Sequence, residues 1–349
     1  MKKYPLIGKG LAVGIILLFV GTCIIPVIAQ DTEKPLPTSR GNWLYVGGSG
    51  HGNYTKIQDA INASSDGDTI FVYDDSSPYF EEIIIEKSIN LLGENHNTVI
   101  DGMTEIWYGI EVKTDYVTID CFTISNFSNG IHIYQSNNAM INNIHSINNL
   151  FGMSLHEAKN NIISNNIMKN CRNVGLSLYK TSNNLIRQNK ITGCAEGIGF
   201  YLFSSDDTII NNEITKNHQA IHSEGFDSDY HYAKCRIENI IIQYNNITDN
   251  TIGIEIYGKF KNCLIENNNF IKNKQNIHYD IFLFHRLSIN KNFWDRIKLL
   301  PQLLPGLASI YLFTNNVNPK NPFDVFLNIP KIVFDWHPAQ QPYDIPGIS

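Results

Sequence analysis

The sequence predicts an all-β fold in which short strands wind into a parallel solenoid. Three observations predict it: a repeat of 22 to 23 residues, apolar residues at alternate positions within each repeat, and an excess of Asn. Of the 349 residues, 52 are Ile and 43 are Asn. Such alternation is typical of strands and not of helices. Because a unit this short cannot bury its own apolar face, its copies must stack to close one continuous core.

A small residue that opens an apolar stretch marks each repeat. This landmark occurs at Gly130, Gly152, Gly175, Gly197, Ala220, Gly253 and Asn276. The steps are 22, 23, 22, 23, 33 and 23 residues, so one coil carries an insertion of ten. Asn-rich turns separate the strands. Asn suits such turns because it tolerates the left-handed conformation and because its amide can bond to the amide one coil away.

Shorter, irregular coils are expected before the regular ones. The expected strands are Thr69–Val72, Ile83–Ile85, Ile89–Leu92, Val99–Ile100, Ile110–Val112, Val117–Ile119 and Phe122–Ile124. A helix over 54–65, opened by a capping box at Thr55 and Gln58, is expected to cover the exposed first coil. The solenoid is then expected over 66–295, with a C-terminal cap and tail over 296–349.

The N-terminus carries an export signal. Three lysines precede an uncharged apolar run from Leu11 to Ala29, and small residues end that run. This pattern predicts a signal peptide over 1–29, followed by an exported linker over 30–53. An uncleaved anchor stays open as the alternative, because the run is nearly as long as a spanning helix. We expect a secreted, periplasmic or cell-surface protein that meets a membrane only through this segment if it is uncleaved.

Five cysteines follow the signal segment, without a C-x-x-C pair that would indicate a zinc site. Cys171 and Cys194 lie 23 residues apart, which places them on neighbouring coils. A disulfide and a stack of two buried thiols both fit this spacing.

Three segments together resemble a known family: Thr55–Ile61, Asp66–Ile70, and the Asn-rich coils that end at Asn292–Trp294. They resemble the right-handed parallel β-helix proteins of the pectin-lyase-like superfamily, and within it the NosD-type branch. The resemblance implies a single-stranded right-handed parallel β-helix. It implies no single function, because such proteins include lyases, hydrolases, carbohydrate-binding surface proteins and accessory proteins of copper-enzyme maturation.

Composition and motifs narrow the function classes. With a net charge of -6, a pI near 6.0 and no dense Lys/Arg block, the chain is not expected to bind nucleic acid. Three of the short catalytic motifs of polygalacturonases of this fold occur here, as Gly50–Gly52, Asp206–Asp207 and Arg296–Lys298. Their order along the chain differs from that in polygalacturonases. We therefore expect a protein that binds polysaccharide or another surface polymer. A polysaccharide lyase, with bound calcium, or a hydrolase stays the alternative.

Two places hold candidate ligand-binding residues. One is the Asp206–Asp207 pair. The other is the insertion at 224–235, where acidic and aromatic side chains together could grip a sugar. The candidates there are Asp227, Asp229, Tyr230, His231 and Tyr232.

A candidate metal site lies two residues after the landmarks. This column reads His132, Ser154, Ser177, Gly199, His222, Glu255 and His278, and it is expected to point out of the solenoid. The last three members stand on successive coils. Imidazole and carboxylate together suit copper or zinc, which makes a copper-binding accessory protein the third hypothesis. A solvated strand face that happens to hold His also explains the column.

Overall fold

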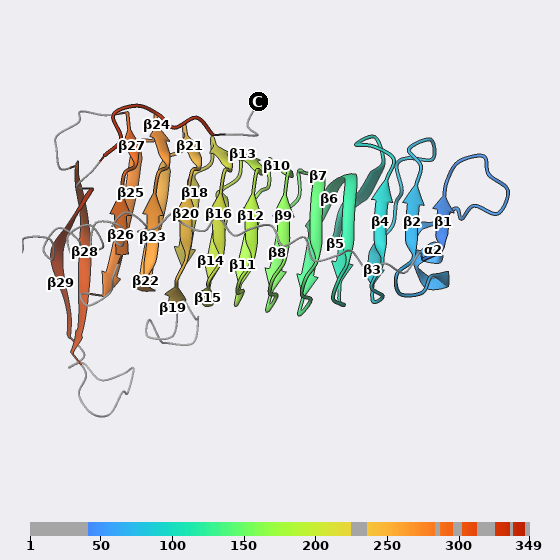
Figure 1. The fold of residues 1–349 in the computed structure, drawn as a ribbon, viewed down its shortest axis with the longest axis horizontal. Coiled ribbons are helices and arrows are strands. Elements are labelled where there is room, and N and C mark those ends of the chain that lie inside the picture. Colours follow the sequence, from blue (N-terminus) through green and yellow to red (C-terminus); the bar gives the residue numbers. More distant parts are fainter. Residues whose placement is uncertain are drawn as a thin grey trace, which may run out of the picture. The chain divides into compact units, whose positions relative to one another are not determined.

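The computed structural model describes residues 41–224, 236–282, 287–295, 302–312, 325–335 and 338–345. The chain divides into residues 1–39 and 40–349, and all described residues belong to the second unit. There, strands pair in parallel from one coil to the next (Figure 1). The predicted parallel β-solenoid is thus confirmed. None of the described helices has the length and apolar character needed to cross a bilayer, and the predicted signal segment lies outside the described residues.

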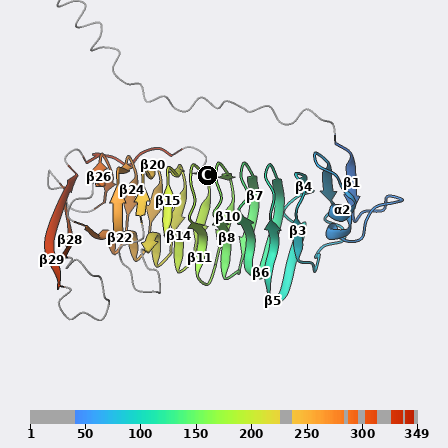
Figure 2. The ribbon, with the colours of Figure 1, turned by 90° about the horizontal axis from the view of Figure 1, so that it is seen from below.

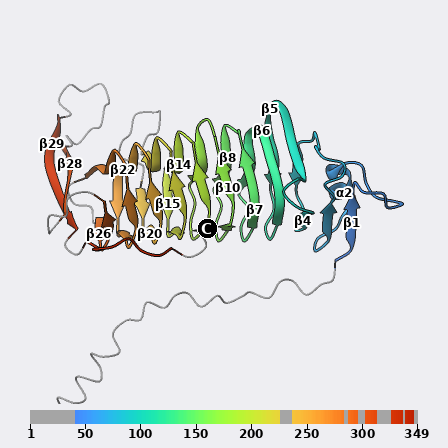
Figure 3. The same ribbon diagram turned by 90° about the horizontal axis from the view of Figure 1, so that it is seen from above.

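Each regular coil adds one strand to each of three sheets (Figures 2 and 3). The first, here called the long-strand sheet, contains β8 (Phe151–His156), β11 (Val174–Tyr179), β14 (Glu196–Tyr201), β18 (Gln219–Glu224), β22 (Ile252–Lys261) and β25 (Gln275–Phe282). The second contains β9 (Ile162–Ser164), β12 (Leu185–Arg187), β16 (Thr208–Ile210), β20 (Ile241–Gln243), β23 (Cys263–Glu266) and β26 (Leu287–Asn290). The third contains β10 (Ile167–Lys169), β13 (Lys190–Thr192), β17 (Glu213–Thr215), β21 (Asn246–Thr248), β24 (Asn269–Ile271) and β27 (Phe293–Trp294). A short extra pairing joins β15 (Phe203–Ser205) and β19 (Arg236–Glu238) to β22.

The early coils contain strands at the expected positions and are irregular, with a register shift between Asp101 and Ile106. Their strands are β1 (Trp43–Val46), β2 (Thr69–Val72), β3 (Ile83–Ile85), β4 (Asn90–Gly93), β5 (Val99–Val112), β6 (Thr118–Tyr134) and β7 (Met140–Ile147). The long strands β5 and β6 each join two predicted short ones by bending from one sheet to the next. β1 was not expected: it lies in the segment assigned to a linker, yet it pairs with β2 in register.

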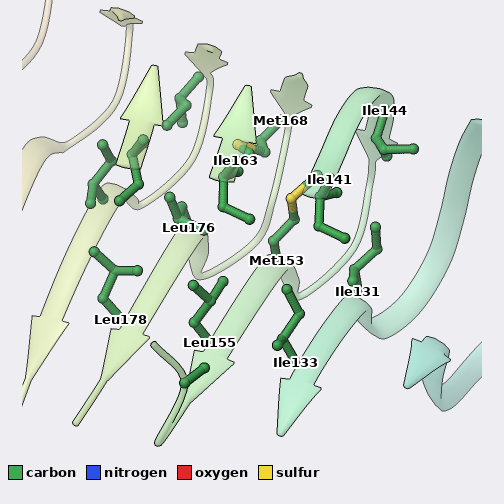
Figure 4. Packing of buried hydrophobic residues seen from close by; sticks show 14 of the residues in the cluster. Ile131, Ile133, Ile141, Ile144, Met153, Leu155, Ile163, Met168, Leu176 and Leu178 are labelled. Atoms are coloured by element: carbon green, nitrogen blue, oxygen red, sulfur yellow. The ribbon is translucent and has the colours of Figure 1, made fainter. Parts of the chain in front are cut away.

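The core consists of aliphatic columns that face the inside of the coils. Ile131, Met153 and Leu176 stack in register on neighbouring strands. Ile133, Leu155 and Leu178 form a second column beside them (Figure 4). All six are fully buried. At roughly 2 kcal/mol per buried aliphatic side chain, such columns provide the main force that holds the coils together.

Buried asparagines bond the turns of successive coils. The Asn ladder, as we call it, consists of Asn166, Asn189, Asn212, Asn245, Asn268 and Asn292. The backbone N–H of each member donates to the side-chain Oδ1 of the next, at 2.9 to 3.0 Å. The side-chain amides also donate to backbone carbonyls of the preceding coil, for example Asn212 to Ile186 at 3.0 Å. Buried polar atoms at the turns are thereby satisfied.

The helix that covers the first coil, α2 (Ile57–Ala63), is shorter than expected and is not opened by a capping box. Gln58 bonds to Asn62 and to the backbone of Ile84 instead. The free N–H groups of Ile57 and Gln58 donate to the Glu81 carboxylate, at 2.9 and 3.1 Å. The prediction of a local cap is therefore wrong, because an acceptor 24 residues downstream satisfies the same donors and places a negative charge at the helix N-terminus.

The C-terminal segment pairs with the last coils. The strand β28 (Gln302–Leu312) extends the long-strand sheet beyond β25, and β29 (Val325–Asp335) pairs antiparallel to it. The buried Asp335 carboxylate accepts hydrogen bonds from the backbone N–H groups of Lys291 and Asn292, both at 3.0 Å, and from Trp294 Nε1 at 3.1 Å. Asp335 thus ends the Asn ladder.

Replacing Asn212 by Ala should destabilise the protein by about 3 kcal/mol, because buried donors and acceptors on both neighbouring coils lose their partner. Chemical denaturation of the purified protein measures this. The matched control is Asn290→Ala, since the Asn290 amide donates to Ser288 Oγ at the surface. Equal midpoints for the two variants would contradict a structural role for the ladder.

Candidate functional site

The column predicted two residues after the landmarks, here called the polar column, forms on the outer side of the long-strand sheet. His222 lies opposite Glu255, and Glu255 lies opposite His278, as the spacing predicts. Towards the N-terminus the column continues through His132 to Glu111. It is not solvated throughout, however: His132, His222 and Glu255 are only 9%, 7% and 6% exposed.

A diagonal contact explains this burial. The residue three positions before the column on one coil reaches the column residue of the next coil. Glu196 Oε2 lies 3.1 Å from His222 Nδ1, and Gln219 Nε2 donates to Glu255 Oε2. In the same way the Tyr108 ring stacks on His132 at 4.7 Å and 9°. These contacts cover His132, His222 and Glu255, whereas Ser154 and His278 stay partly exposed.

Phenol groups complete the cluster around His222. The Tyr201 hydroxyl donates to Glu196 Oε2 at 2.5 Å, and the Tyr257 hydroxyl donates to Glu255 Oε1 at 2.8 Å. Burial by itself would raise the pKa of Glu196. The contacts with His222 and Tyr201 outweigh it and hold that pKa below its usual value, so Glu196 is ionised at neutral pH.

This arrangement does not fit a three-ligand copper site. The Glu255 oxygens accept from Gln219 and Tyr257, His222 faces Glu196, and His278 Nδ1 lies 3.2 Å from Gln275 Nε2. Across the described ranges, no group of three or more His, Cys, Asp or Glu side chains could hold a metal ion. His222, Glu255 and His278 stack in register, but they do not converge on one point.

At the other end of the column, His132 lies beside a carboxylate. Its Nδ1 is 3.5 Å from Glu111 Oε1, and Glu111 pairs with Lys113 at 2.6 Å. Burial lowers the pKa of His132, although the Glu111 charge opposes the shift. The imidazole is thus neutral at pH 7, and its aromatic face packs against Tyr108.

A second column of rings lies two residues further along the same strands. The ring ladder, as we call it, consists of Tyr134, His156, Tyr179 and Tyr201, one from each of four successive coils in register. The Tyr134 and His156 rings lie 5.3 Å apart, and those of His156 and Tyr179 lie 4.4 Å apart. Tyr134 is 36% exposed. Sequence reasoning missed this ladder, although the aromatic residues recur in the sequence at the coil period.

Charged and amide side chains flank the ring ladder. Gln135 Nε2 donates to Glu157 Oε2 at 2.8 Å, and Lys180 Nζ donates to Glu157 Oε1 at 3.0 Å. Lys180 Nζ also lies 5.4 Å from the centre of the Tyr179 ring. The exposed Tyr134 ring, the half-buried His156 and Tyr179 rings and these polar groups thus run side by side over three coils.

The structure separates the two members of the aspartate pair. Asp206 is exposed and accepts from Asn239 Nδ2 at 2.8 Å. Asp207 is fully buried and accepts from the Thr181 hydroxyl and from the backbone and side-chain N–H groups of Asn184, at 2.7 to 2.9 Å. Asp206 lies at a turn with a left-handed backbone, at a φ of 59°, and the Asp207 side chain that follows it is buried, so Asp207 is unavailable to a surface ligand. Asp227, Asp229, Tyr230, His231 and Tyr232 lie outside the described residues.

Asp207→Asn should stabilise the protein at pH 7.5 by on the order of 2 kcal/mol and leave stability at pH 4 almost unchanged. Burial raises the pKa of Asp207 to about 6 from 3.8, so the folded state holds the proton more tightly than the unfolded state. Its contribution to stability is present below pH 4 and is lost as the pH rises through 6. Thermal melts of both proteins between pH 4 and 8 measure the effect, and parallel curves would contradict it.

Comparison with known proteins finds one family model and several solved structures that are similar to this chain. A family model described as "Periplasmic copper-binding protein (NosD)" matches residues 61–296. Among solved structures, the chain is similar to a polygalacturonase from Erwinia carotovora ssp. carotovora, with 11% identity, a TM-score of 0.53, and coverage of 72% of this chain and 92% of that one. It is also similar to the Dettilon tailspike protein, with 12% identity, a TM-score of 0.46, and coverage of 78% and 74%.

At such low identity, likeness to a solved structure concerns the fold alone. A search among curated proteins finds no match. The family model, however, covers more than half of the chain and ends where the regular coils end. The right-handed parallel β-helix and the NosD-type resemblance are both confirmed, and this chain belongs to the NosD family of periplasmic copper-binding proteins.

Proposed function

We propose that this protein is an exported β-helix that binds a polysaccharide along the long-strand sheet. The observation that carries the proposal is the ring ladder, which presents one ring per coil on four coils in a row. A polymer of sugar units is itself a repeat, and its unit length is comparable with the coil spacing of about 4.8 Å. Successive rings can therefore meet successive sugars.

The chemistry of this surface suits sugars. Aromatic faces pack on the C–H faces of pyranose rings, while side-chain amides and carboxylates bond to the hydroxyls. Gln135, Glu157 and Lys180 supply such groups beside the rings. Their mutual hydrogen bonds hold them in place before a ligand arrives, which lowers the entropy cost of binding.

A lyase or hydrolase finds less support on the described surface. Glycoside hydrolysis needs two carboxyl groups at a defined separation, one of them a proton donor. Asp207 is buried away from Asp206, and the contacts of Glu196 keep its pKa low. Binding, and not turnover, is therefore the function proposed for this face.

Copper binding is the second candidate function, and membership of the NosD family favours it. The contacts of His222, Glu255 and His278 with other side chains weigh against the predicted trio as that site. A copper site in this chain therefore needs other donors.

Replacing Tyr179 by Ala should weaken polysaccharide binding about tenfold, or about 1.4 kcal/mol, because one of the two middle rings of the four-ring ladder is removed. Tyr179→Phe should bind nearly as well as the original protein, since stacking needs the ring and not the hydroxyl. Size-exclusion chromatography of a fluorescent panel of neutral and acidic polysaccharides, each incubated with the protein, measures binding as a shift to larger size.

The matched control is Tyr116→Ala, which removes an exposed tyrosine from the turn between β5 and β6. It should bind like the original protein. The proposal fails if no polysaccharide shifts, or if the Tyr116 and Tyr179 variants lose binding equally. A shift of the polymer to smaller size would establish cleavage and replace the binding proposal with an enzyme.

A further inference from the structure

A row of polar residues lies beside the ring ladder. Gln135, Glu157 and Lys180 each follow a ladder residue directly in the sequence, and all three have a left-handed backbone, at a φ of 50°, 54° and 52°. Their backbone N–H groups donate to the carbonyl of the ladder residue on the next coil, at 2.9 to 3.3 Å. The same turn geometry thus places the three side chains one above another, about 4.8 Å apart. We call these three residues the polar row.

The Glu157 carboxylate is the centre of the polar row. Gln135 Nε2 donates to Glu157 Oε2 at 2.8 Å, and Lys180 Nζ donates to Glu157 Oε1 at 3.0 Å. The Glu157 and Lys180 side chains are 35% and 38% exposed, so a ligand on the rings can reach both. The contacts with Gln135 and Lys180 hold the pKa of Glu157 below its usual value, so Glu157 is ionised at neutral pH.

Carboxylates also balance the positive charges around the ladder. Lys113 Nζ lies 2.6 Å from Glu111 Oε2, just as Lys180 Nζ lies 3.0 Å from Glu157 Oε1. His156 adds no charge at pH 7, because burial lowers the pKa of its imidazole. The rings are therefore accompanied by charges that are already paired.

An exposed lysine lies in the turn beyond the polar row. Lys159 stands in register with Asn137, whose backbone N–H donates to the Asp115 carboxylate at 2.7 Å. Two coils further along the same register, Ser205 is followed by the exposed Asp206. Carboxylates thus lie on both sides of Lys159 along this turn. Among the described residues near the rings, no cluster of unpaired cations is present that would attract a polyanion.

We propose that the ring ladder takes neutral polysaccharides and that Glu157 excludes polymers of uronic acid. The inference rests on the proposed function and names the class of polymer that the rings would bind. Glu157 accepts two hydrogen bonds from the polar row, and a carboxylate has lone pairs for two further donors. A sugar hydroxyl is such a donor. A uronate carboxylate is not, and it would bring a second negative charge next to Glu157.

Lys180 is the group through which an acidic polymer could bind instead. Its ammonium group, however, is already bonded to Glu157 and lies 5.4 Å from the centre of the Tyr179 ring. An anion bonded to Lys180 would therefore also lie within about 6 Å of Glu157 Oε1. Because the pair carries no net charge, most of its attraction for a polyanion is cancelled.

Polygalacturonic acid and its methyl ester test the inference, because they share one backbone and differ in charge. Each fluorescently labelled polymer is titrated with the exported protein at low ionic strength, next to the neutral polymers of the panel. The neutral polymers and the methyl ester should bind, and the free acid should bind about tenfold more weakly than the ester. Glu157→Gln keeps the size of the side chain and removes its charge, so it should narrow this ratio about fivefold.

The matched control is Glu213→Gln, because Glu213 forms the same kind of pair with Lys190, at 2.9 Å, on the third sheet. It should leave the ratio between ester and free acid as it is in the original protein. If the free acid binds as tightly as the ester, or if both variants narrow the ratio equally, the neutral-polymer inference is wrong while polysaccharide binding stands. If no polymer binds to the original protein, the proposed function fails and this inference fails with it.

Discussion

The hydrogen bond from a backbone N–H to the asparagine oxygen one coil further on is the interaction on which the rest of this structure depends. Apolar burial drives the coils together, but it tolerates sliding between similar aliphatic side chains. The hydrogen bonds of the Asn ladder do not tolerate such sliding, because a slip by one residue would leave buried donors without partners. They fix each turn above the preceding one. Every outward column, polar or aromatic, inherits its alignment from that register.

Register also explains which features the sequence could predict. The coil period, the strand positions after residue 130 and the alignment of His222 with Glu255 and His278 all follow from spacing alone. The burial of that column does not follow, because it depends on a diagonal contact with a residue three positions earlier on the previous coil. The predicted capping box is absent for a similar reason, since Glu81, 24 residues away, accepts the hydrogen bond of the Ile57 backbone N–H.

The strand β1 shows another limit of sequence reasoning. Trp43–Val46 is short, and glycines flank it on both sides, so its local signal is that of a linker. Only the pairing with β2 makes it a strand. The ring ladder was readable from the sequence in principle, because its members recur at the coil period. Charged and imidazole side chains predict chemistry, whereas recurring rings predict a contact surface, and only the first kind of pattern gave a predicted site.

The carboxylate of Asp335 has a consequence for how long such a solenoid can be. An asparagine side chain both donates and accepts, so it passes the ladder on, whereas an ionised carboxylate only accepts. Asp335 closes the Asn ladder, and Asp207 likewise closes the shorter series that runs from Asn161 through Asn184. Each carboxylate ends its series because it has no N–H group to donate to a further coil. Coils added after Asp335 would therefore need another ladder to continue on, in the way that the coils after Asp207 continue on the Asn ladder beside it.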